Sequence, residues 1–339
     1  MGHEMIGKPP TIADVARAAG VSVPTVSRVL TGSVPVGPKR RELVQRAIEE
    51  LGYRPNAAAR ALVSGRRSMI AVLAANTSRY GYARTVEGIE EAARAAGYMV
   101  VITVVETAEA YDVNTAVDMV LSHSVAGVIV LDFDEPGHAA LTALPTTVPV
   151  AVAAASPSRS ITLPRAYLAD QRAAREATKY LLSLGHRTVH HIALPSSGRK
   201  GGRTAGWSAA LKAAGIDPPE ALATTWNPVD AYEPAKVLAA DPVVTAVLAG
   251  NDEVALAVLR AMTEQGRSVP HDVSVIGFDD QPIASLVSPA LTTVAQDFNE
   301  LGRQSFALLD RAISRTDGHT TVSVPARLVV RESTARRSI

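Results

Sequence analysis

The sequence predicts a small all-α head joined to an α/β body of two doubly wound, parallel-sheet lobes. Short helical patterns separated by turn residues fill the first 54 residues or so. From residue 68 onward, apolar strands alternate with helices of roughly 10–15 residues, the pattern of parallel sheets covered on both faces. A chain of 339 residues is also longer than a single hydrophobic core usually supports. We therefore expect several packed units.

The composition narrows the class of protein. Hydrophobic residues make up 47% and aromatic residues only 4%, so the core must consist mainly of aliphatic side chains. The absence of cysteine excludes disulfides, thiolate metal ligands and cysteine nucleophiles. No apolar run reaches the roughly 18 residues of a membrane helix, and residues 1–10 lack a signal-like stretch. These features predict a soluble, cytoplasmic protein.

Charge is divided unevenly along the chain. Residues 1–67 contain eleven Lys or Arg and five Asp or Glu, a net charge of +6, and the remainder contains 23 against 28, a net charge of −5. A basic head on an acidic body is typical of nucleic-acid-binding proteins. Chance clustering is the other interpretation.

The head has the pattern of a helix-turn-helix. Thr11 and Asp14 form a capping pair for a first helix that ends at Gly20, and its apolar face consists of Ile12, Val15, Ala16 and Ala19. Ser22 caps a second helix over 23–30, with Pro24 in its first turn. A third helix, at about 38–51, is expected to close the core with Leu43, Ala47, Ile48 and Leu51.

We expect the second helix to enter the major groove of DNA. Arg28 can bind guanine bidentately, and Val23 with Pro24 offers apolar contact to a thymine methyl group. Thr25, Ser27 and backbone N–H groups then hold phosphates. A plain three-helix bundle with a polar face is the alternative.

Three motifs of the head closely resemble the lactose-repressor (LacI/GalR) family: TIADVARAAGVS at 11–22, TVSRVL at 25–30 and LGYRPN at 51–56. The resemblance implies a hinge helix at 55–64 that folds on operator DNA, where Asn56 caps or contacts the backbone and Leu62 wedges into the minor groove. Residues 56–62 are helix-prone but too short to be stable alone, and an inserted leucine can kink DNA. Gly37 departs from the Ser or Thr that the family often has before the third helix. The expected DNA-binding residues are Thr11, Ser22, Val23, Pro24, Thr25, Ser27, Arg28, Tyr53, Asn56, Ala59 and Leu62.

The body is predicted to alternate strands and helices. The expected strands cover 69–75, 98–104, 127–131, 148–153, 190–194, 246–249 and 273–278. The expected helices cover 85–96, 113–122, 170–184, 204–214, 234–240 and 253–265. Two such halves make two lobes with a cleft, and ligands bind beyond the carboxyl ends of the strands.

Polar and aromatic residues near those strand ends suit a sugar. Asn251 and Asp279 each directly follow a strand, Arg203 lies at the start of a helix, and Trp226 lies in the loop after that helix. Arg203 and Asp279 are complementary to adjacent hydroxyls, and an indole face stacks on a pyranose. Alternatively, Asp279 caps a helix and Arg203 simply pairs with it.

The family resemblance continues through the body to about residue 332, in LGHR at 184–187, RTAGW at 203–207, GFDD at 277–280 and LTTVAQDF at 291–298. By position it implies the effector-binding residues Ala75, Arg199, Arg203, Trp226, Asn251, Asp279, Gln296 and Phe298. Two departures concern the ligand: Ala154 stands where the family usually has Asp, and Thr107 stands where the lactose-type repressor has Arg. A galactoside and another sugar or glycoside are thus both open.

The expected domains are the helix-turn-helix domain at 1–54, the hinge helix and linker at 55–67, the effector-binding and dimerisation domain at 68–333, and a tail at 334–339. The resemblance implies that the chain crosses between the lobes three times. Lobe 1 then comprises about 68–167 plus 298–325, and lobe 2 about 168–297 plus 326–333.

An enzyme is not expected. His190 and His191 are adjacent on a strand and point to opposite faces, and His186 ends a helix whose carbonyls it helps to satisfy. Asp132 and Asp134 are interpreted as loop carboxylates without a phosphate loop or nucleophile elbow nearby. The glycine-rich run 198–202 lacks the Walker spacing and is interpreted as a mobile cleft loop. We expect no cofactor and no metal.

The expected partners are pseudo-palindromic double-stranded operator DNA, a small effector such as a sugar or glycoside, and a second copy of the chain, without a membrane. No leucine heptad follows Val330, which favours a dimer over a coiled-coil tetramer. The expected function is repression of carbohydrate-metabolism genes, relieved when effector binds between the lobes, although the opposite polarity also occurs in the family. The alternatives are a periplasmic-type sugar-binding protein without a DNA role and a regulator with a non-sugar effector such as a purine.

Overall fold

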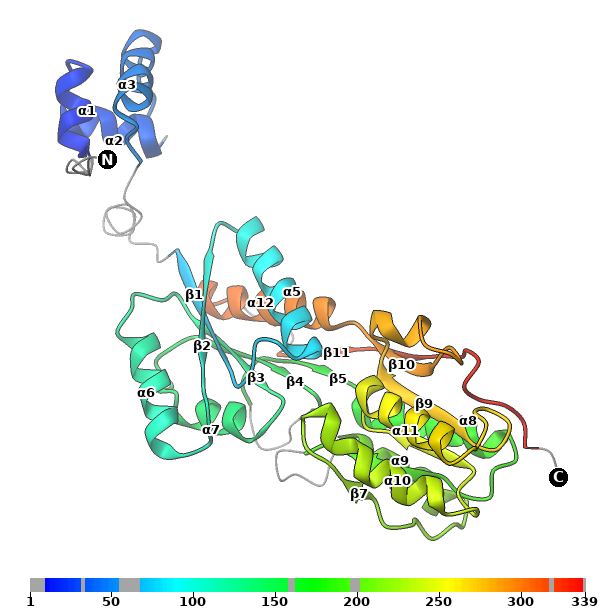
Figure 1. Cartoon of the computed structure of the whole chain (residues 1–339). Helices are drawn as coiled ribbons and strands as arrows, with labels where there is room; N and C mark the ends of the chain where they lie inside the picture. Colours follow the sequence, from blue (N-terminus) through cyan, green and yellow to red (C-terminus); the bar gives the residue numbers. More distant parts are fainter. Residues whose placement is uncertain are drawn as a thin grey trace, which may run out of the picture. The chain divides into compact units, whose positions relative to one another are not determined.

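The structure is a computed structural model that describes residues 10–31, 34–54, 68–157, 162–195, 202–316 and 320–337. The chain divides into two compact units, Met1–Ser68 and Met69–Ile339, which we call the head and the body and describe separately. The head is helical and the body has two α/β lobes (Figure 1), so the predicted fold class is confirmed.

The head begins with a capped helix and two tight turns. In α1 (Ile12–Ala18), the Thr11 N–H donates to Asp14 Oδ2 at 2.9 Å, and the Asp14 N–H donates to Thr11 Oγ1 at 3.4 Å. Gly20 adopts a φ of +62°, which favours glycine, before α2 (Val23–Thr31). Gly37 starts α3 (Pro38–Leu51) without a side-chain cap. The capping pair and the glycine turn are as the sequence predicts.

The core of the head differs in part from the prediction. Its buried side chains are Val15, Ala16, Ala19, Val26, Val44 and Ala47. The expectation that Leu43 and Leu51 close this core is wrong, because they are 39% and 38% exposed. Leu43 precedes Val44 and is turned about 100° away from it around the helix, and Leu51 is the last residue of α3.

Lobe 1 is built on a parallel six-stranded sheet in the order β11-β5-β4-β3-β1-β2. Its strands are β1 (Met69–Ala74), β2 (Met99–Val104), β3 (Val128–Asp132), β4 (Val150–Ala154), β5 (Arg165–Leu168) and β11 (Thr321–Val324). One face packs against α5 (Tyr80–Ala95) and α12 (Phe298–Ser314), and the other against α6 (Ala110–Leu121) and α7 (Glu135–Ala143). Because both faces are covered, β3 and β4 are buried throughout and consist almost entirely of aliphatic residues.

Lobe 2 repeats this plan in the order β12-β10-β9-β8-β6-β7, with only β12 antiparallel to its neighbour. Its strands are β6 (His190–Ala193), β7 (Leu222–Ala223), β8 (Ala246–Ala249), β9 (Ser274–Asp279), β10 (Thr292–Gln296) and β12 (Ala326–Val329). One face packs against α8 (Asp170–Ser183) and α9 (Gly202–Ala213), and the other against α10 (Tyr232–Ala240) and α11 (Asp252–Glu264). Two short 3₁₀ helices are η1 (Pro228–Ala231) and η2 (Pro282–Ser285).

The described chain passes between the two sheets after β5, after β10 and after β11. After β5 it enters α8, which packs on the lobe 2 sheet, and after β10 it returns to α12, which packs on the lobe 1 sheet. The first two connections therefore lie beside Asp170 and Gln296. Any movement of one lobe against the other must be accommodated at these segments.

Glycines set the close approach of α5 and α12, which lie side by side in Figure 1. A Cβ added to Gly88 would lie 2.0 Å from the carbonyl oxygen of Asn299, and a Cβ added to Gly302 would lie 2.2 Å from that of Thr85. Only hydrogen in place of a side chain allows this contact. The two helices, about 200 residues apart in the chain, are thus held together in lobe 1.

The structure corrects the interpretation of two polar residues and adds a contact for a third. Asp132 is not a loop carboxylate but the last residue of β3. Asp134 does lie in the loop that follows, as the N-cap of α7, where it accepts from the Gly137 N–H at 3.2 Å. His186 does not end a helix, since α8 ends at Ser183. Its ring nitrogens lie 3.1 Å from Thr245 Oγ1 and 3.0 Å from Ser274 Oγ, and burial lowers its pKa. Each of these residues can be buried because a side chain distant in the sequence forms a hydrogen bond with it.

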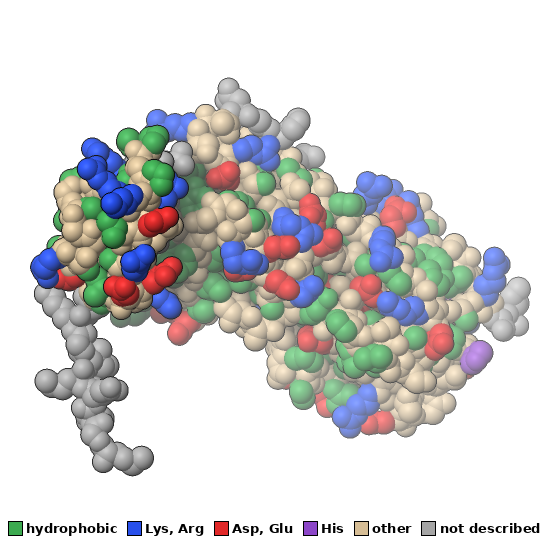
Figure 2. All heavy atoms as spheres, turned by 90° about the horizontal axis from the view of Figure 1, so that it is seen from above, with side chains coloured by type: hydrophobic (Ala, Val, Ile, Leu, Met, Phe, Trp, Pro, Cys, Tyr) green, Lys and Arg blue, Asp and Glu red, His purple; other side chains and the backbone are tan. Residues whose placement is uncertain are grey.

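Among the described residues, no helix is long and apolar enough to cross a membrane. Over the face shown in Figure 2, Lys and Arg side chains are interspersed with Asp and Glu.

Candidate functional site

The first candidate surface is formed by α2 of the head. Buried Val26 anchors this helix in the core, while Ser22, Val23, Pro24 and Arg28 are exposed and Thr25 and Ser27 are half-buried. The hydroxyls of Ser22 and Thr25 lie 2.9 Å apart. The predicted groove-facing residues thus share the outer surface of one helix.

Of the other predicted DNA-binding residues, the structure describes Thr11 and Tyr53. Thr11 caps α1 and remains exposed, whereas Tyr53 packs against the core of the head. Asn56, Ala59 and Leu62 lie outside the described residues. Exposed basic side chains of the head, available to phosphates, are Arg17, Arg28, Lys39, Arg40, Arg41, Arg46 and Arg54.

The second candidate site is a cavity in the body with walls from both lobes. Five of the predicted effector-binding residues line it: Arg203, Trp226, Asn251, Asp279 and Phe298. Gln296 lies directly behind this lining, bonded to Arg203. Ala75 follows β1 and is not part of the described lining, and Arg199 lies outside the described residues.

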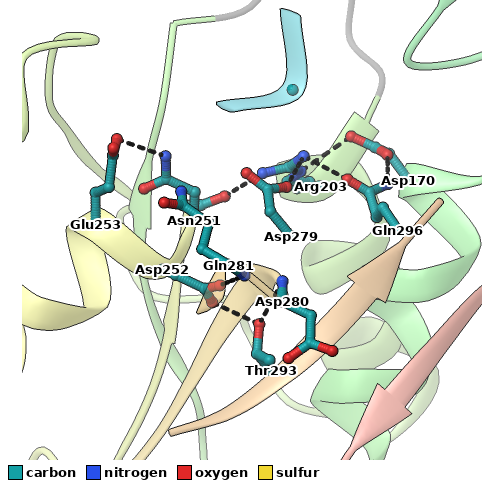
Figure 3. Close-up of polar contacts among 12 residues, drawn as sticks. Asp170, Arg203, Asn251, Asp252, Glu253, Asp279, Asp280, Gln281, Thr293 and Gln296 are labelled. Atoms are coloured by element: carbon teal, nitrogen blue, oxygen red, sulfur yellow. Dashed lines mark hydrogen bonds and ion pairs between the residues drawn. The ribbon is translucent and has the colours of Figure 1, made fainter. Parts of the chain in front are cut away.

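Arg203 organises the lobe 2 wall of the cavity (Figure 3). It is the second residue of α9, and its guanidinium lies 4.0 Å from the centre of the Phe278 ring. Nε donates to Asp170 Oδ2 at 2.9 Å, Nη1 donates to the Gly250 carbonyl at 2.5 Å, and Nη2 donates to Asp279 Oδ1 and Gln296 Oε1, both at 2.9 Å. Every nitrogen of this side chain is therefore engaged by the protein itself. The pairing of Arg203 with Asp279 that the sequence left open is present.

Gln296 and Asp170 complete this network. The Gln296 amide donates to Asp170 Oδ1 at 2.5 Å, and both side chains are buried. Because Asp170 begins α8 and Gln296 ends β10, Arg203 joins two of the three segments that connect the lobes. The ligand wall and the connecting segments thus belong to one hydrogen-bonded unit.

Asp279 has an unusual electrostatic environment. Burial raises the pKa of its carboxyl group to about 7, against the favourable charge of Arg203 and with the added repulsion of Asp252 and Asp170. Its φ of +103° and the φ of +54° at Asp280 turn the chain sharply at the end of β9. Asp280 faces Arg331 at 2.6 Å instead of the Arg203 network.

Asn251 and Asp252 occupy the start of α11. Asn251 caps the helix by accepting from the Val254 N–H at 2.9 Å, which leaves its amide N–H groups toward the cavity apart from a 3.4 Å contact with Glu253. Asp252 accepts from the Gln281 N–H at 2.7 Å and the Thr293 hydroxyl at 2.5 Å. Its pKa is raised to about 6 by burial. Asp252 therefore braces β9, β10 and α11 behind the site.

The lobe 1 wall contains residues that the sequence analysis did not select. The Arg79 guanidinium stacks 4.8 Å from the centre of the Trp226 ring and lies 3.8 Å from Asp134, whose carboxylate accepts from the Tyr82 hydroxyl at 2.5 Å. Arg79 therefore contacts lobe 2 through the indole that was expected to stack on a sugar. No signal in the sequence pairs Arg79 with Trp226, which is 147 residues away.

Asp132 and Arg165 form a second polar pair in this wall. Arg165 Nη1 donates to Asp132 Oδ2 at 3.0 Å, both residues are buried, and both line the cavity. His138 lies 3.4 Å from the other oxygen of Asp132. Asp132 directly follows the predicted strand at 127–131, so the rule that selected Asn251 and Asp279 would also have selected it.

His191 of β6 is held by hydrogen bonds inside lobe 2. His191 is fully buried, with Nδ1 2.8 Å from the Leu248 carbonyl and Nε2 3.0 Å from Thr204 Oγ1. Burial lowers its pKa to about 4, so the ring is neutral at pH 7. Within the part of the chain that the structure describes, no group of three or more His, Cys, Asp or Glu residues could hold a metal ion.

A helix-turn-helix head together with a two-lobed body and a polar cavity defines the class of DNA-binding transcriptional regulators. Residues 11–56 match the family model of bacterial regulatory proteins, lacI family, and residues 178–334 match that of a periplasmic binding protein-like domain.

Similar proteins cover 96% of the chain. The catabolite control protein A of Priestia megaterium is 31% identical over 96% of this chain and 99% of its own. The lactose operon repressor of Escherichia coli strain K12 is 32% identical (96% and 91%), and the PurR repressor of Erwinia tasmaniensis is 34% identical (96% and 97%). The chain therefore belongs to the LacI family of transcriptional regulators, and the regulators that it matches are not enzymes.

Solved structures agree with this assignment. A crystal structure of the Lac repressor dimer bound to operator and the anti-inducer ONPF superposes with a TM-score of 0.88 at 32% identity, covering 97% of this chain and 100% of the other. A complex of the regulator CelR with cellobiose gives a TM-score of 0.70 at 30% identity, covering 96% and 99%.

Proposed function

We propose that this regulator represses carbohydrate-metabolism genes and is released from its operator by a sugar or glycoside bound between the lobes. It acts in the cytoplasm as a homodimer and needs no cofactor. We place the DNA-binding domain at 1–54, the hinge at 55–67 and the effector-binding domain at 68–333, with lobe 1 at about 68–167 plus 298–325 and lobe 2 at about 168–297 plus 326–333.

The observation that carries the sugar assignment is the convergence of Asp279, Asn251 and Trp226 on one cavity. A carboxylate accepts from hydroxyl groups, an amide N–H donates to them, and an indole face packs on the apolar side of a pyranose ring. Phe298 adds an apolar wall. Polar groups that converge on a cavity together with aromatic side chains are typical of small-molecule sites. The CelR structure, with its bound cellobiose, supports the same class of ligand.

The head supplies the DNA-binding half of the proposal. Exposed Arg28 reads a guanine in the major groove, while Val23 and Pro24 contact a thymine methyl group. Ser22, Thr25 and Ser27 position the helix on phosphates, and Thr11, Tyr53, Asn56 and Ala59 contact the backbone. Leu62 wedges into the minor groove at the centre of a pseudo-palindromic operator.

Coupling between the two sites follows from the position of Arg203. A ligand hydroxyl bound to Asp279 changes the charge balance at Arg203, which also holds Asp170 and Gln296 beside the connecting segments. Ligand contacts to both walls favour one relative position of the lobes, and that position disfavours the paired hinges. Reciprocity requires operator DNA to weaken effector binding by the same factor.

Dimerisation is proposed from apolar surface on both lobes. On lobe 1, Met99 of the edge strand β2 and Tyr111 and Met119 of α6 are 59%, 81% and 53% exposed. On lobe 2, Val229, Val237 and Leu286 are 75%, 62% and 77% exposed. Exposed apolar side chains of this size contribute to protein interfaces where they gather into a patch. Sedimentation should give the mass of a dimer for the wild type and a shift toward monomer for Tyr111→Glu, with the polar exposed Glu109→Gln as control.

The deciding experiment combines ligand and DNA binding on the full chain. A thermal-shift screen of mono- and disaccharides, with purine bases included because PurR repressors are among the relatives, identifies the effector class. A gel shift on operator DNA selected from a random pool, with a salt titration, then measures release. Salt-insensitive binding or no retarded complex at low salt contradicts DNA binding, and release by a purine but by no sugar contradicts the sugar assignment.

A further inference from the structure

The strongest unused feature of the cavity is the partly bonded guanidinium of Arg165. The residue is 2% exposed, and only Nη1 has a partner, Asp132. No group among the described residues accepts from Nε or Nη2. Donors in such a position lose their water without a replacement, which folded proteins avoid unless the group has a further role. Other atoms of Arg165 line the cavity.

The strand register explains why these nitrogens are left free. Arg165 of β5 pairs with Val152 of β4, and Ala154, two residues further along β4, pairs with Asp132 of β3. These side chains share one face of the sheet, so the ion pair passes over the small side chain of Ala154. Since β4 offers only Val150, Val152 and Ala154 on this face, no acid of that strand competes for the remaining N–H groups.

The free groups have a specific shape. Nε–H and Nη2–H of a guanidinium point in the same direction and form a planar fork, which matches the two oxygens of a carboxylate or phosphate. Both nitrogens are covered in this conformation, so binding of a ligand group by the fork requires the guanidinium to turn toward the cavity that the residue already lines.

The two walls of the cavity differ in how far the protein neutralises their arginines. On lobe 2, Arg203 is shared by two carboxylates, those of Asp170 and Asp279, and each of its nitrogens already donates to the protein. On lobe 1, Arg165 has one carboxylate partner, and Arg79 is a third exposed and only 3.8 Å from Asp134. Donor capacity for a negatively charged ligand group therefore remains on lobe 1, and acceptor capacity for hydroxyls lies on lobe 2.

We propose that the effector is an acidic sugar derivative whose carboxylate or phosphate binds the Arg165 fork, with Arg79 beside it, while its hydroxyls bind Asp279 and Asn251. This inference rests on the proposed function, because it specifies the ligand of the same cavity. Asp132 is a positioning residue that holds the guanidinium by its Nη1. Arg79 leaves the face of Trp226 free when it turns to the ligand.

The test compares matched acidic and neutral sugars on the full-length protein by isothermal titration calorimetry. The pairs are glucuronate with glucose, galacturonate with galactose, and glucose 6-phosphate with glucose. The acidic member of at least one pair should bind about tenfold or more tightly than its neutral partner, the effect of one charge-assisted bidentate contact. The same acid should release operator DNA in a gel shift.

A variant of Arg165 distinguishes the planar geometry of the guanidinium from its positive charge. Arg165→Lys keeps a cation for Asp132 but lacks the fork, so it should weaken binding of the acid by about tenfold and leave the neutral sugar within about twofold. The control is Arg303→Lys, which alters a surface arginine paired with Glu91 and Glu300 and should change neither affinity. Should Arg165→Lys fail to fold, the acid-to-neutral ratio of the wild type decides alone.

Three outcomes overturn the inference: neutral sugars that bind as tightly as the acids, acids whose affinity is unchanged in Arg165→Lys, or no binding by any acid. In the first case, a neutral sugar that still releases operator leaves the proposed function intact. Operator binding that no sugar of either kind affects contradicts the proposed function itself. The carboxylate and phosphate pairs show which of the two oxyanions the fork accepts.

Discussion

Replacement of Asp279 by Asn tests the ligand wall with little disturbance of the backbone. Asp and Asn both tolerate positive φ, so the φ of +103° can be kept. The introduced asparagine retains an oxygen for Arg203, whose Nη2 lies 2.9 Å from Asp279 Oδ1, but removes the charge from the oxygen offered to a ligand hydroxyl. Loss of a charge-assisted hydrogen bond is worth about 1.5–3 kcal/mol. Effector affinity should therefore fall about 10- to 150-fold at pH 8, and operator affinity without effector should stay unchanged.

The pH dependence gives this prediction a second measurement. With a pKa of about 7, Asp279 is largely ionised at pH 8 and about one-tenth ionised at pH 6. If the carboxylate accepts the ligand hydroxyl, calorimetric affinity of the wild type should fall by up to about tenfold from pH 8 to pH 6, and that of Asp279→Asn should not. Asp280→Asn, the same change at the neighbouring residue that faces Arg331, is the matched control. Equal affinity of the Asp279 variant and the wild type at pH 8 would refute the reasoning.

Three further predictions concern the head, the core and a buried acid. Arg28→Ala should weaken binding to the selected operator by about 1–3 kcal/mol in a gel shift and relax the preference at one base pair, and unchanged specificity would contradict base reading. Gly88→Ala should lower the unfolding free energy by about 3 kcal/mol in urea, because its Cβ would meet the Asn299 carbonyl at 2.0 Å; Glu87→Ala on the exposed side is the control, and equal stability would exclude the close packing. The raised pKa of Asp252, about 6, means that the folded state binds a proton more tightly than the unfolded state, so its contribution is lost as the pH rises from about 4 to 6. Asp252→Asn should therefore gain stability relative to the wild type by about 1.4 kcal/mol per pH unit over that interval, and a pH-independent difference would contradict the shift.

Local rules were sufficient for much of the fold. The capping pair of Thr11 and Asp14 and the turn at Gly20 follow from side-chain chemistry within a few residues. The buried strands of both lobes follow from continuous aliphatic runs, because sheets covered on both faces require them. Position in the family motif then selected five residues that line the cavity, among them Arg203 and Asp279.

The rest of the site depends on contacts that no local pattern encodes. β5 begins with a charged residue, so it lacks the continuous apolar run by which strands were predicted. Its Arg165 is buried only because the register brings Asp132 of β3 within 3.0 Å. Arg79 likewise reaches Trp226 from the other lobe. Asp132, interpreted from the sequence as a loop carboxylate, is buried because its partner Arg165 lies on another strand.

The separation of the two cavity walls bears on how such a regulator acquires a new ligand. Arg203, Asp170 and Gln296 tie the lobe 2 wall to the connecting segments, whereas Arg79 and Arg165 make their contacts with Asp134, Trp226 and Asp132. Substitutions on the lobe 1 wall can thus alter which molecule is recognised while the residues that transmit its presence stay in place. Mutagenesis toward a new ligand should begin at positions 79, 132, 154 and 165, since changes there leave the contacts of Arg203 with Asp170 and Gln296 intact.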